Sequence, residues 1–141
     1  MAGKFWNSMV PELTVSDFGR SLEFYTGLLG FSVRNRREVP PFAYLEQETV
    51  HIMLEQFHAE SWQTGELAPP FGRGVNFQLE LTAIAPIYGR LQVAGYPLFE
   101  EMSEEWYETG DTVSGQKEFL VQDPDGYLLR FTEFLGEKPK E

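Results

Sequence analysis

Four polar side chains in this sequence have the types and settings needed for metal or acid–base chemistry. Glu12, Glu55 and Glu80 lie in largely apolar stretches, and His51 opens the stretch HIML. Carboxylate and imidazole are ligands of divalent cations, so these residues are one candidate metal set. A lone histidine among apolar residues is more often structural, and His58 falls in a polar loop. We find no cysteine, no Ser-His-Asp spacing and no Gly-rich phosphate loop, which excludes thiolate chemistry and disfavours nucleophilic and phosphate-binding sites.

A positive charge stands in the middle of a predicted strand near the C-terminus. Residues 122–131 read QDPDGYLLRF, in which the Pro-Asp-Gly sequence predicts a tight turn between two strands. Asp123 and Asp125 are therefore expected to be turn residues and not catalytic carboxylates. Alternation along the second strand places Arg130 on the face opposite to its apolar neighbours.

An internal repeat predicts the elements that position these residues. Five pairs of apolar residues are each separated by 66 residues: Leu13–Leu79, Val15–Leu81, Phe18–Ile84, Leu22–Tyr88 and Tyr25–Leu91. Each copy begins with a strand followed by a helix. We expect the first helix to follow Ser16-Asp17 and end near Gly30, and the second to follow Thr82 and end at Gly95.

The repeat continues through two later hairpins. Residues 42–57 align with residues 119–134 without a gap, so that Phe42 corresponds to Phe119 at a separation of 77 residues. The fold class is predicted as α+β, with two tandem βαβββ modules forming an open curved mixed sheet with a cleft. The modules are expected at about 9–57 and 75–134, with a Pro- and Gly-rich linker at 58–74 and a frayed tail at 135–141, all within one domain spanning 1–141.

One helix can cover only one face of each sheet, which leaves the other face open for binding. Alternation assigns a mostly polar and charged set of residues to these open faces. The expected set is Val10, Glu12, Thr14, His51, Met53, Glu55, Asn76, Gln78, Glu80, Leu128, Arg130 and Thr132.

Composition limits the classes of partner. The 141 residues are 42% hydrophobic and 15% aromatic, typical of a globular chain. A net charge of −11 argues against nucleic acid and favours cationic ligands. No apolar run is long enough to span a bilayer and no signal peptide is recognised, so we expect a cytoplasmic protein without a membrane partner.

The paired modules resemble the vicinal-oxygen-chelate superfamily, which includes glyoxalases, extradiol dioxygenases and bleomycin-resistance proteins. The resemblance lies in VPELTVSDFGRSLEFYTGLLGF, GVNFQLELT and EFLVQDPDGYLLRF, and it is strongest to the bleomycin-resistance branch. Metal enzymes of the superfamily carry His and Glu ligands at four positions. By this resemblance those positions are Val10, Met53, Asn76 and Arg130, which are poor ligands for a divalent cation. We therefore expect no metal and no cofactor, and binding is favoured over catalysis.

The resemblance implies a protein that sequesters a planar, cationic glycopeptide antibiotic of the bleomycin type in a dimer cleft. Aromatic residues are candidates to stack on such a ligand, although each could equally serve packing, and Arg130 could instead pair with Glu12 or Glu80. The predicted ligand-binding set is Glu12, Phe42, Tyr44, His51, Glu55, Trp62, Asn76, Glu80, Trp106, Tyr107 and Arg130.

Pro11 cannot donate a ladder hydrogen bond, so the first strand is expected at a sheet edge. The resemblance further implies a homodimer in which the N-terminal arm, with Phe5 and Trp6, is exchanged between subunits. Two alternatives stay open: a divergent metal-dependent glyoxalase or dioxygenase, with an ion displaced toward His51 and the glutamates, and a small-molecule sensor of the same fold.

Overall fold

The computed structural model describes residues 5–141, and the chain divides into two compact units, Met1–Phe71 and Gly72–Glu141. In the first unit, β1 (Glu12–Val15) is followed by α1 (Phe18–Glu23), a π-helical turn (Phe24–Leu28), β2 (Ser32–Glu38), β3 (Pro41–Gln47) and β4 (Val50–Gln56). The second unit contains β5 (Asn76–Glu80), α2 (Ala85–Val93), β6 (Glu100–Thr109), β7 (Thr112–Gln122) and β8 (Leu128–Pro139).

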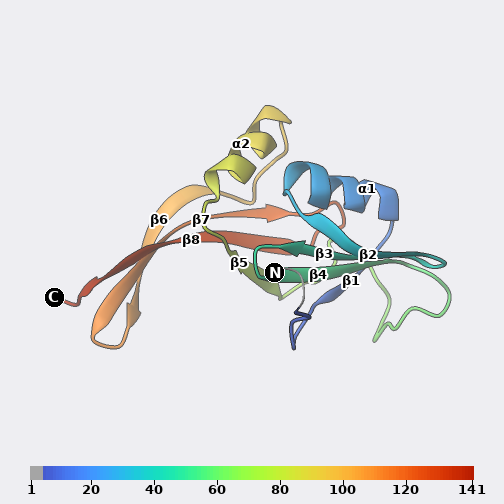
Figure 1. Cartoon of the computed structure of the whole chain (residues 1–141), viewed down its shortest axis with the longest axis horizontal. Helices are drawn as coiled ribbons and strands as arrows, with labels where there is room; N and C mark the ends of the chain where they lie inside the picture. Colours follow the sequence, from blue (N-terminus) through green and yellow to red (C-terminus); the bar gives the residue numbers. More distant parts are fainter. Residues whose placement is uncertain (1–4) are drawn as a thin grey trace. The chain divides into compact units, whose positions relative to one another are not determined.

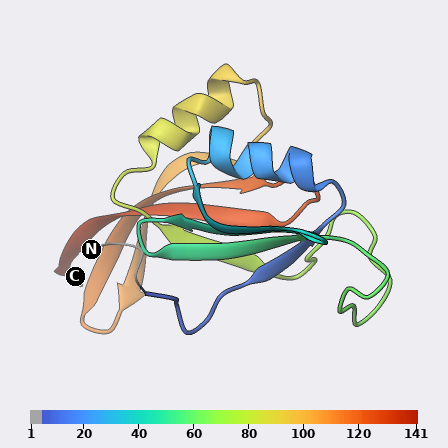
Figure 2. The same ribbon diagram turned by 45° about the vertical axis from the view of Figure 1, so that its right-hand side comes forward.

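Each unit is a four-stranded mixed sheet with one helix (Figures 1 and 2). The strand orders are β1-β4-β3-β2 and β5-β8-β7-β6, so β1 lies at an edge as Pro11 predicts. The first strand of each unit runs parallel to the last, and the remaining pairs are antiparallel. The predicted fold class, α+β with two βαβββ modules, is confirmed.

Side chains accept hydrogen bonds from backbone amides at both helix starts. Asp17 accepts a hydrogen bond from the Arg20 amide at 3.1 Å, the expected N-cap. The amide of Phe18 donates to Gln56 Oε1 at 2.8 Å, and the amide of Ile84 donates to Glu133 Oε1 at 3.1 Å. Amides that a helix leaves unpaired are thus satisfied by the last strand of the same unit.

The apolar repeat residues form the core of their own units. Leu13, Val15 and Leu54 are buried in the first unit, and α1 packs on β3 and β4. In the second unit the rings of Phe119 and Phe131 stack with centroids 5.3 Å apart, and Tyr88 of α2 lies 5.1 Å from Phe119. Burial of these apolar faces fixes the strand register, because a one-residue slip would turn them outward.

The ladders confirm one part of the repeat and correct another. Glu12 pairs with Met53 and Gln78 pairs with Arg130, so the separations of 66 and 77 residues hold for the parallel strands. The hairpins differ, however: two residues join the Gln47↔Val50 pair, whereas five join Gln122↔Leu128.

The difference in turn length shifts β7 by one residue relative to the ungapped alignment. Tyr44 opposes Met53 in the first unit, and the residue that opposes Arg130 in the second is Leu120. Phe42 therefore corresponds to Glu118, and the predicted equivalence with Phe119 is wrong.

The predicted frayed tail is also wrong, because β8 continues to Pro139 and pairs with β7 as far as Thr112. Within residues 5–141, no helix is long and apolar enough to cross a membrane.

Candidate functional site

Each sheet has a face turned away from its helix, and these two faces carry most of the predicted binding residues. We define the first face by β1, β3 and β4 residues that the register places side by side: Glu12, Thr14, Phe42, Tyr44, Glu46, His51, Met53 and Glu55. The second face comprises Asn76, Gln78, Glu80, Tyr107, Gln116, Glu118, Leu120, Leu128, Arg130 and Thr132.

The N-terminal segment covers part of the first face. The Trp6 ring meets Tyr44 edge-on, with centroids 4.7 Å apart, and the Arg34 guanidinium lies 4.2 Å from the Trp6 centroid. Arg34 also donates to the Phe5 carbonyl, and the Asn7 side chain donates to the Thr49 carbonyl at 2.8 Å. Within this chain, residues 5–7 therefore contact the sheet of their own unit, and an exchanged arm stays a prediction.

His51 is buried beneath this segment and serves a structural network. The Tyr44 hydroxyl and the Asn7 amide, the latter at 3.4 Å, both contact His51 Nδ1. Burial lowers the pKa of His51, the nearby Arg34 cation lowers it further, and Glu46 acts in the opposite sense. The His51 ring is therefore neutral, and its Nδ1 is the hydrogen-bond acceptor. Tyr44 and His51 are hydrogen-bonded to each other, and a ligand contact at either residue stays a prediction.

Two carboxylates crowd the β1 side of the first face. Glu12 pairs with Met53 and Thr14 with Glu55, so Glu12 and Glu55 lie on one face of adjacent strands. Burial raises the pKa of Glu12, the Glu55 charge raises it further, and Arg37 partly offsets both. His58 Nε2 lies 3.4 Å from Glu55 Oε1. Arg37 offsets the negative charge of the pair only in part, so the pair favours a cation placed beside it.

Phe42 is less available than the sequence predicts. It is 3% exposed, and Tyr44 is 6% exposed. The Arg37 guanidinium lies 4.0 Å from the Phe42 ring centroid. These two rings are packed against side chains of the first unit, which fits the packing role left open for them, and a ligand contact at either ring stays a prediction.

Arg130 is held by a network on the second face. Its Nη2 and Nε atoms lie 3.0 and 3.2 Å from Glu118 Oε1, and Nη2 lies 3.2 Å from the Tyr107 hydroxyl. Glu118 also accepts from Gln116 Nε2 at 2.8 Å and from Tyr107 at 3.1 Å. The predicted partners of Arg130, Glu12 and Glu80, are replaced by Glu118.

The charges of this network reinforce one another. Burial tends to raise the pKa of Glu118, but hydrogen bonds from Gln116 and Arg130 outweigh it and hold the pKa below its ordinary value. Burial tends to lower the pKa of Arg130, whereas Glu118 raises it with a net upward result. Burial and the contact with Glu118 raise the pKa of Tyr107. Glu118 is ionised and Tyr107 is neutral at neutral pH.

The remaining predicted residues are not all brought together. Trp106 opposes Gly115 across the β6–β7 ladder, on the face opposite to Tyr107, with Lys138 Nζ 4.1 Å from its ring centroid. The tryptophan therefore lies apart from Arg130. Trp62 is 91% exposed in the loop after β4, and Asn76 and Glu80 are exposed on β5.

The side chains do not fit the metal site of the superfamily's enzymes. Met53 lies on β4 and Arg130 on β8, the final strand of each unit in the sequence, and Arg130 forms an ion pair with Glu118. The displaced alternative is also disfavoured, because His51 is buried and its Nδ1 accepts from the Asn7 amide, which leaves the ring proton on Nε2. Within the described part of the chain, residues 5–141, no three His, Asp or Glu side chains are grouped as metal ligands would be.

Comparison with known proteins agrees with this architecture. The profile of the Glyoxalase/Bleomycin resistance protein/Dioxygenase superfamily matches residues 9–131. The chain belongs to this superfamily. A bleomycin resistance protein from Geobacillus stearothermophilus is 25% identical over 132 residues, covering 86% of this chain and 92% of the relative. A protein of the same description from Staphylococcus aureus matches equally.

Solved structures show the same fold. TioX from Micromonospora sp. ML1 superposes with a TM-score of 0.67 at 20% identity, over 92% of this chain and all of the other. A virulence protein from Salmonella typhimurium superposes with a TM-score of 0.63 at 24% identity, over 93% of this chain and 98% of the other. The superfamily that the sequence resembles is confirmed by the profile match over residues 9–131.

Sequence reasoning missed several residues of these networks, among them Glu118, Gln116, Arg34 and Asn7. The signal for Glu118 was present as the acidic residue in QKEFLV, which precedes the hairpin, but the ungapped alignment placed it on the helix side. Arg34 sits at an irregularity between Val33 and Asn35, where simple alternation fails.

Proposed function

We propose that this protein binds a planar, cationic small molecule of the bleomycin type on the sheet face that carries Glu12 and Glu55, without a metal cofactor. The observation that carries the proposal is this carboxylate pair. Two acidic groups side by side on adjacent strands repel each other, and a bound cation relieves that repulsion. The chain's net charge of −11 steers cations toward it.

Family membership supports a small-molecule binder. The curated relatives that match 86% of the chain carry the name bleomycin resistance protein. Aromatic rings near the carboxylates supply apolar surface, since Trp6 is exposed above Tyr44. A flat heterocycle stacked on such a ring gains both apolar contact and cation–π attraction.

A homodimer with exchanged N-terminal arms and a cytoplasmic location form part of the same proposal. The first described residues are exposed and apolar at Phe5 and Trp6, which gives a partner a surface to cover. Sedimentation velocity on the intact chain and on a variant lacking residues 1–8 tests the arm. Loss of dimer in the truncated variant is expected, and an unchanged dimer contradicts exchange.

Tryptophan fluorescence titrated with metal-free bleomycin tests the ligand. We expect quenching at micromolar drug and about two- to fivefold weaker binding in Glu12→Gln and Glu55→Gln, the effect of one partly exposed charge. Glu23→Gln removes an equal charge from an exposed position on α1 and serves as the matched control. Equal affinity in all three variants would contradict the assigned face.

Metal analysis of the purified protein tests the absence of a cofactor. Substoichiometric Zn, Ni, Mn and Fe are expected. Stoichiometric metal that is lost in Glu12→Gln would refute the metal-free proposal and favour an enzyme.

A further inference from the structure

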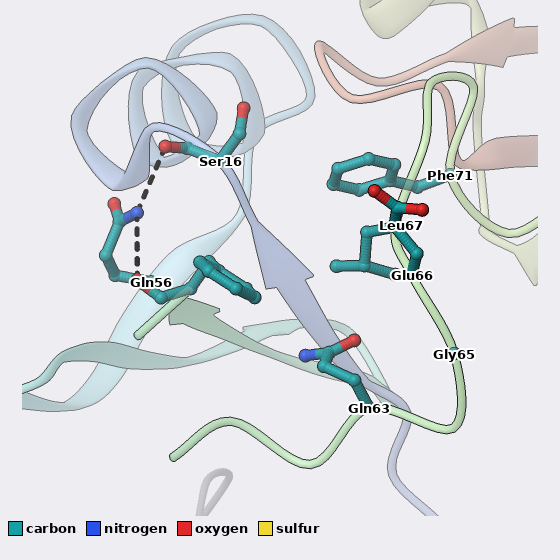
Figure 3. Close-up of a pocket in the computed structure, with 8 residues that line it drawn as sticks. Ser16, Gln56, Gln63, Gly65, Glu66, Leu67 and Phe71 are labelled. Carbon is teal, nitrogen blue, oxygen red and sulfur yellow. Dashed lines mark hydrogen bonds between the residues drawn. The ribbon is translucent and has the colours of Figure 1, made fainter. Parts of the chain in front are cut away.

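A pocket of about 540 Å³ lies in the first unit, lined by residues that are not among those defining the first face. It is bounded by the ends of β1 and β4 and by the loop that follows β4 (Figure 3). The lining residues are Ser16, Gln56, Phe57, Gln63, Gly65, Glu66, Leu67 and Phe71. Its volume lies within the range of small-molecule sites, about 300–1,000 Å³. None of the residues proposed to bind the bleomycin-type ligand is among them.

Hydrogen bonds hold two sides of this pocket in place. Gln56 Nε2 donates to the Ser16 carbonyl at 3.0 Å, and Gln56 Oε1 accepts from the Phe18 amide at 2.8 Å. Gln63 Nε2 contacts Thr14 Oγ1 at 3.3 Å, which ties the loop to β1. The cavity is therefore preformed, which lowers the entropic cost of binding.

Apolar side chains supply most of its surface. Phe71 is buried at the base, Leu67 is half-buried, and Phe57 is 50% exposed. Figure 3 shows Phe71 and Leu67 on the loop, facing the Gln56 and Ser16 side. An exposed phenylalanine beside a buried one gives a ligand ring or alkyl group two surfaces to contact.

The polar group at the rim is negative. Glu66 is exposed, and within residues 5–141 the structure gives it no ion pair. The Gln63 amide oxygen adds a neutral acceptor. Neither side chain supplies positive charge, so an anionic ligand finds no counterpart here, whereas an ammonium group can contact Glu66 while its apolar body lies on Leu67 and Phe71.

We propose that this pocket is a second binding site, for a small hydrophobic amine whose aryl or alkyl body contacts Phe57, Leu67 and Phe71 and whose ammonium group pairs with Glu66. The geometry assigns the occupant by charge and polarity together. A neutral apolar molecule would contact the apolar side chains but leave the Glu66 carboxylate without a cation, and a polar cation would pair with Glu66 but leave the apolar side chains exposed to water.

Three probes of equal ring type separate these terms: 2-phenylethylamine, 2-phenylethanol and 3-phenylpropanoate. Binding to the full chain is followed by amide chemical shifts in two-dimensional NMR. We expect saturable shifts at Gly65 and Leu67 with the amine, weaker shifts with the alcohol and none with the carboxylate. Shifts confined to other residues, or equal binding of the carboxylate, would overturn the proposal.

Variants identify the contacts. Glu66→Gln should weaken the amine by about threefold or more and leave the alcohol unchanged, as expected for one exposed ion pair. Phe57→Ser should weaken both. Glu60→Gln, an exposed acid of the same loop outside the pocket, is the control and should change neither. An amine affinity that is the same in Glu66→Gln and Glu60→Gln contradicts the ion pair.

Shifts at Gly65 and Leu67 that follow protein concentration without ligand show a second copy in the pocket and refute the small-molecule site.

Discussion

Replacing Glu118 by Gln isolates the ion pair that holds Arg130 on the second face. The change keeps the side-chain volume and removes the charge. Glu118 is 13% exposed and Arg130 is 26% exposed, so the pair is neither fully buried nor at the open surface. The variant leaves a partly buried guanidinium beside a neutral amide, which also loses its charged contact with Tyr107.

The magnitude follows from this intermediate burial. Exposed pairs are worth about 0.2–1 kcal/mol, and breaking a buried pair costs about 3–5 kcal/mol. We expect the free energy of unfolding to fall by about 2 kcal/mol at pH 7, between these two ranges. A double-mutant cycle with Arg130→Gln should give a coupling of about 1–2 kcal/mol, because the partners are in direct contact.

Urea denaturation followed by circular dichroism measures both quantities. Because the pKa of Glu118 is held below its ordinary value of 4.5, its stabilisation is present above that pH and is lost as pH falls through the lower native pKa. The difference between wild type and Glu118→Gln should therefore shrink in acid. Glu80→Gln, exposed on the same face, is the control and should cost less than about 0.5 kcal/mol. A coupling near zero would refute the network as drawn.

Three further changes test other parts of the structure. Gly115→Ala should lower the free energy of unfolding by about 1–3 kcal/mol in urea denaturation, because the new Cβ would lie 2.5 Å from the Trp106 ring; unchanged stability contradicts that contact. In wild type, the free energy of unfolding should decline as pH falls below about 6.5, because burial lowers the pKa of His51 in the folded protein and the unfolded chain then binds a proton that the folded protein does not; His51→Gln should lack that decline, and an identical pH profile contradicts it. Asp123→Ala should cost about 2–3 kcal/mol and lower the melting temperature, because Asp123 Oδ1 accepts three amides at 2.9–3.0 Å; a loss below about 0.5 kcal/mol refutes that role.

The repeat made the fold predictable, because apolar spacing is preserved where strands and helices bury the same faces. Both helices begin within a few residues of the expected position, and the separations of 66 and 77 residues appear as equivalent ladder pairs at Met53 and Arg130. Spacing could not reveal the turn lengths, since two-residue and five-residue turns can join strands of similar pattern. Because the longer turn shifts β7 by one residue, the alignment did not place Glu118 on the same face as Arg130.

The candidate site was predictable only in part. Alternation placed Glu12, Glu55 and Arg130 correctly on faces turned away from the helices. It could not foresee that Trp6 would lie over Tyr44, because contacts between a terminal segment and a sheet leave no periodic trace in the sequence. Alternation also separates Trp106 from Tyr107, since adjacent strand residues point to opposite faces, so the two rings could not both belong to one face of the sheet.

Isothermal titration of the intact protein with metal-free bleomycin, in buffer containing EDTA, tests the central claim most directly. If binding needs no metal, we expect a saturable isotherm with micromolar or tighter affinity. That affinity should be unchanged when the chelator is present and weaker in Glu12→Gln. Absence of binding heat across several temperatures, together with unchanged tryptophan fluorescence, would contradict it, as would binding that EDTA abolishes.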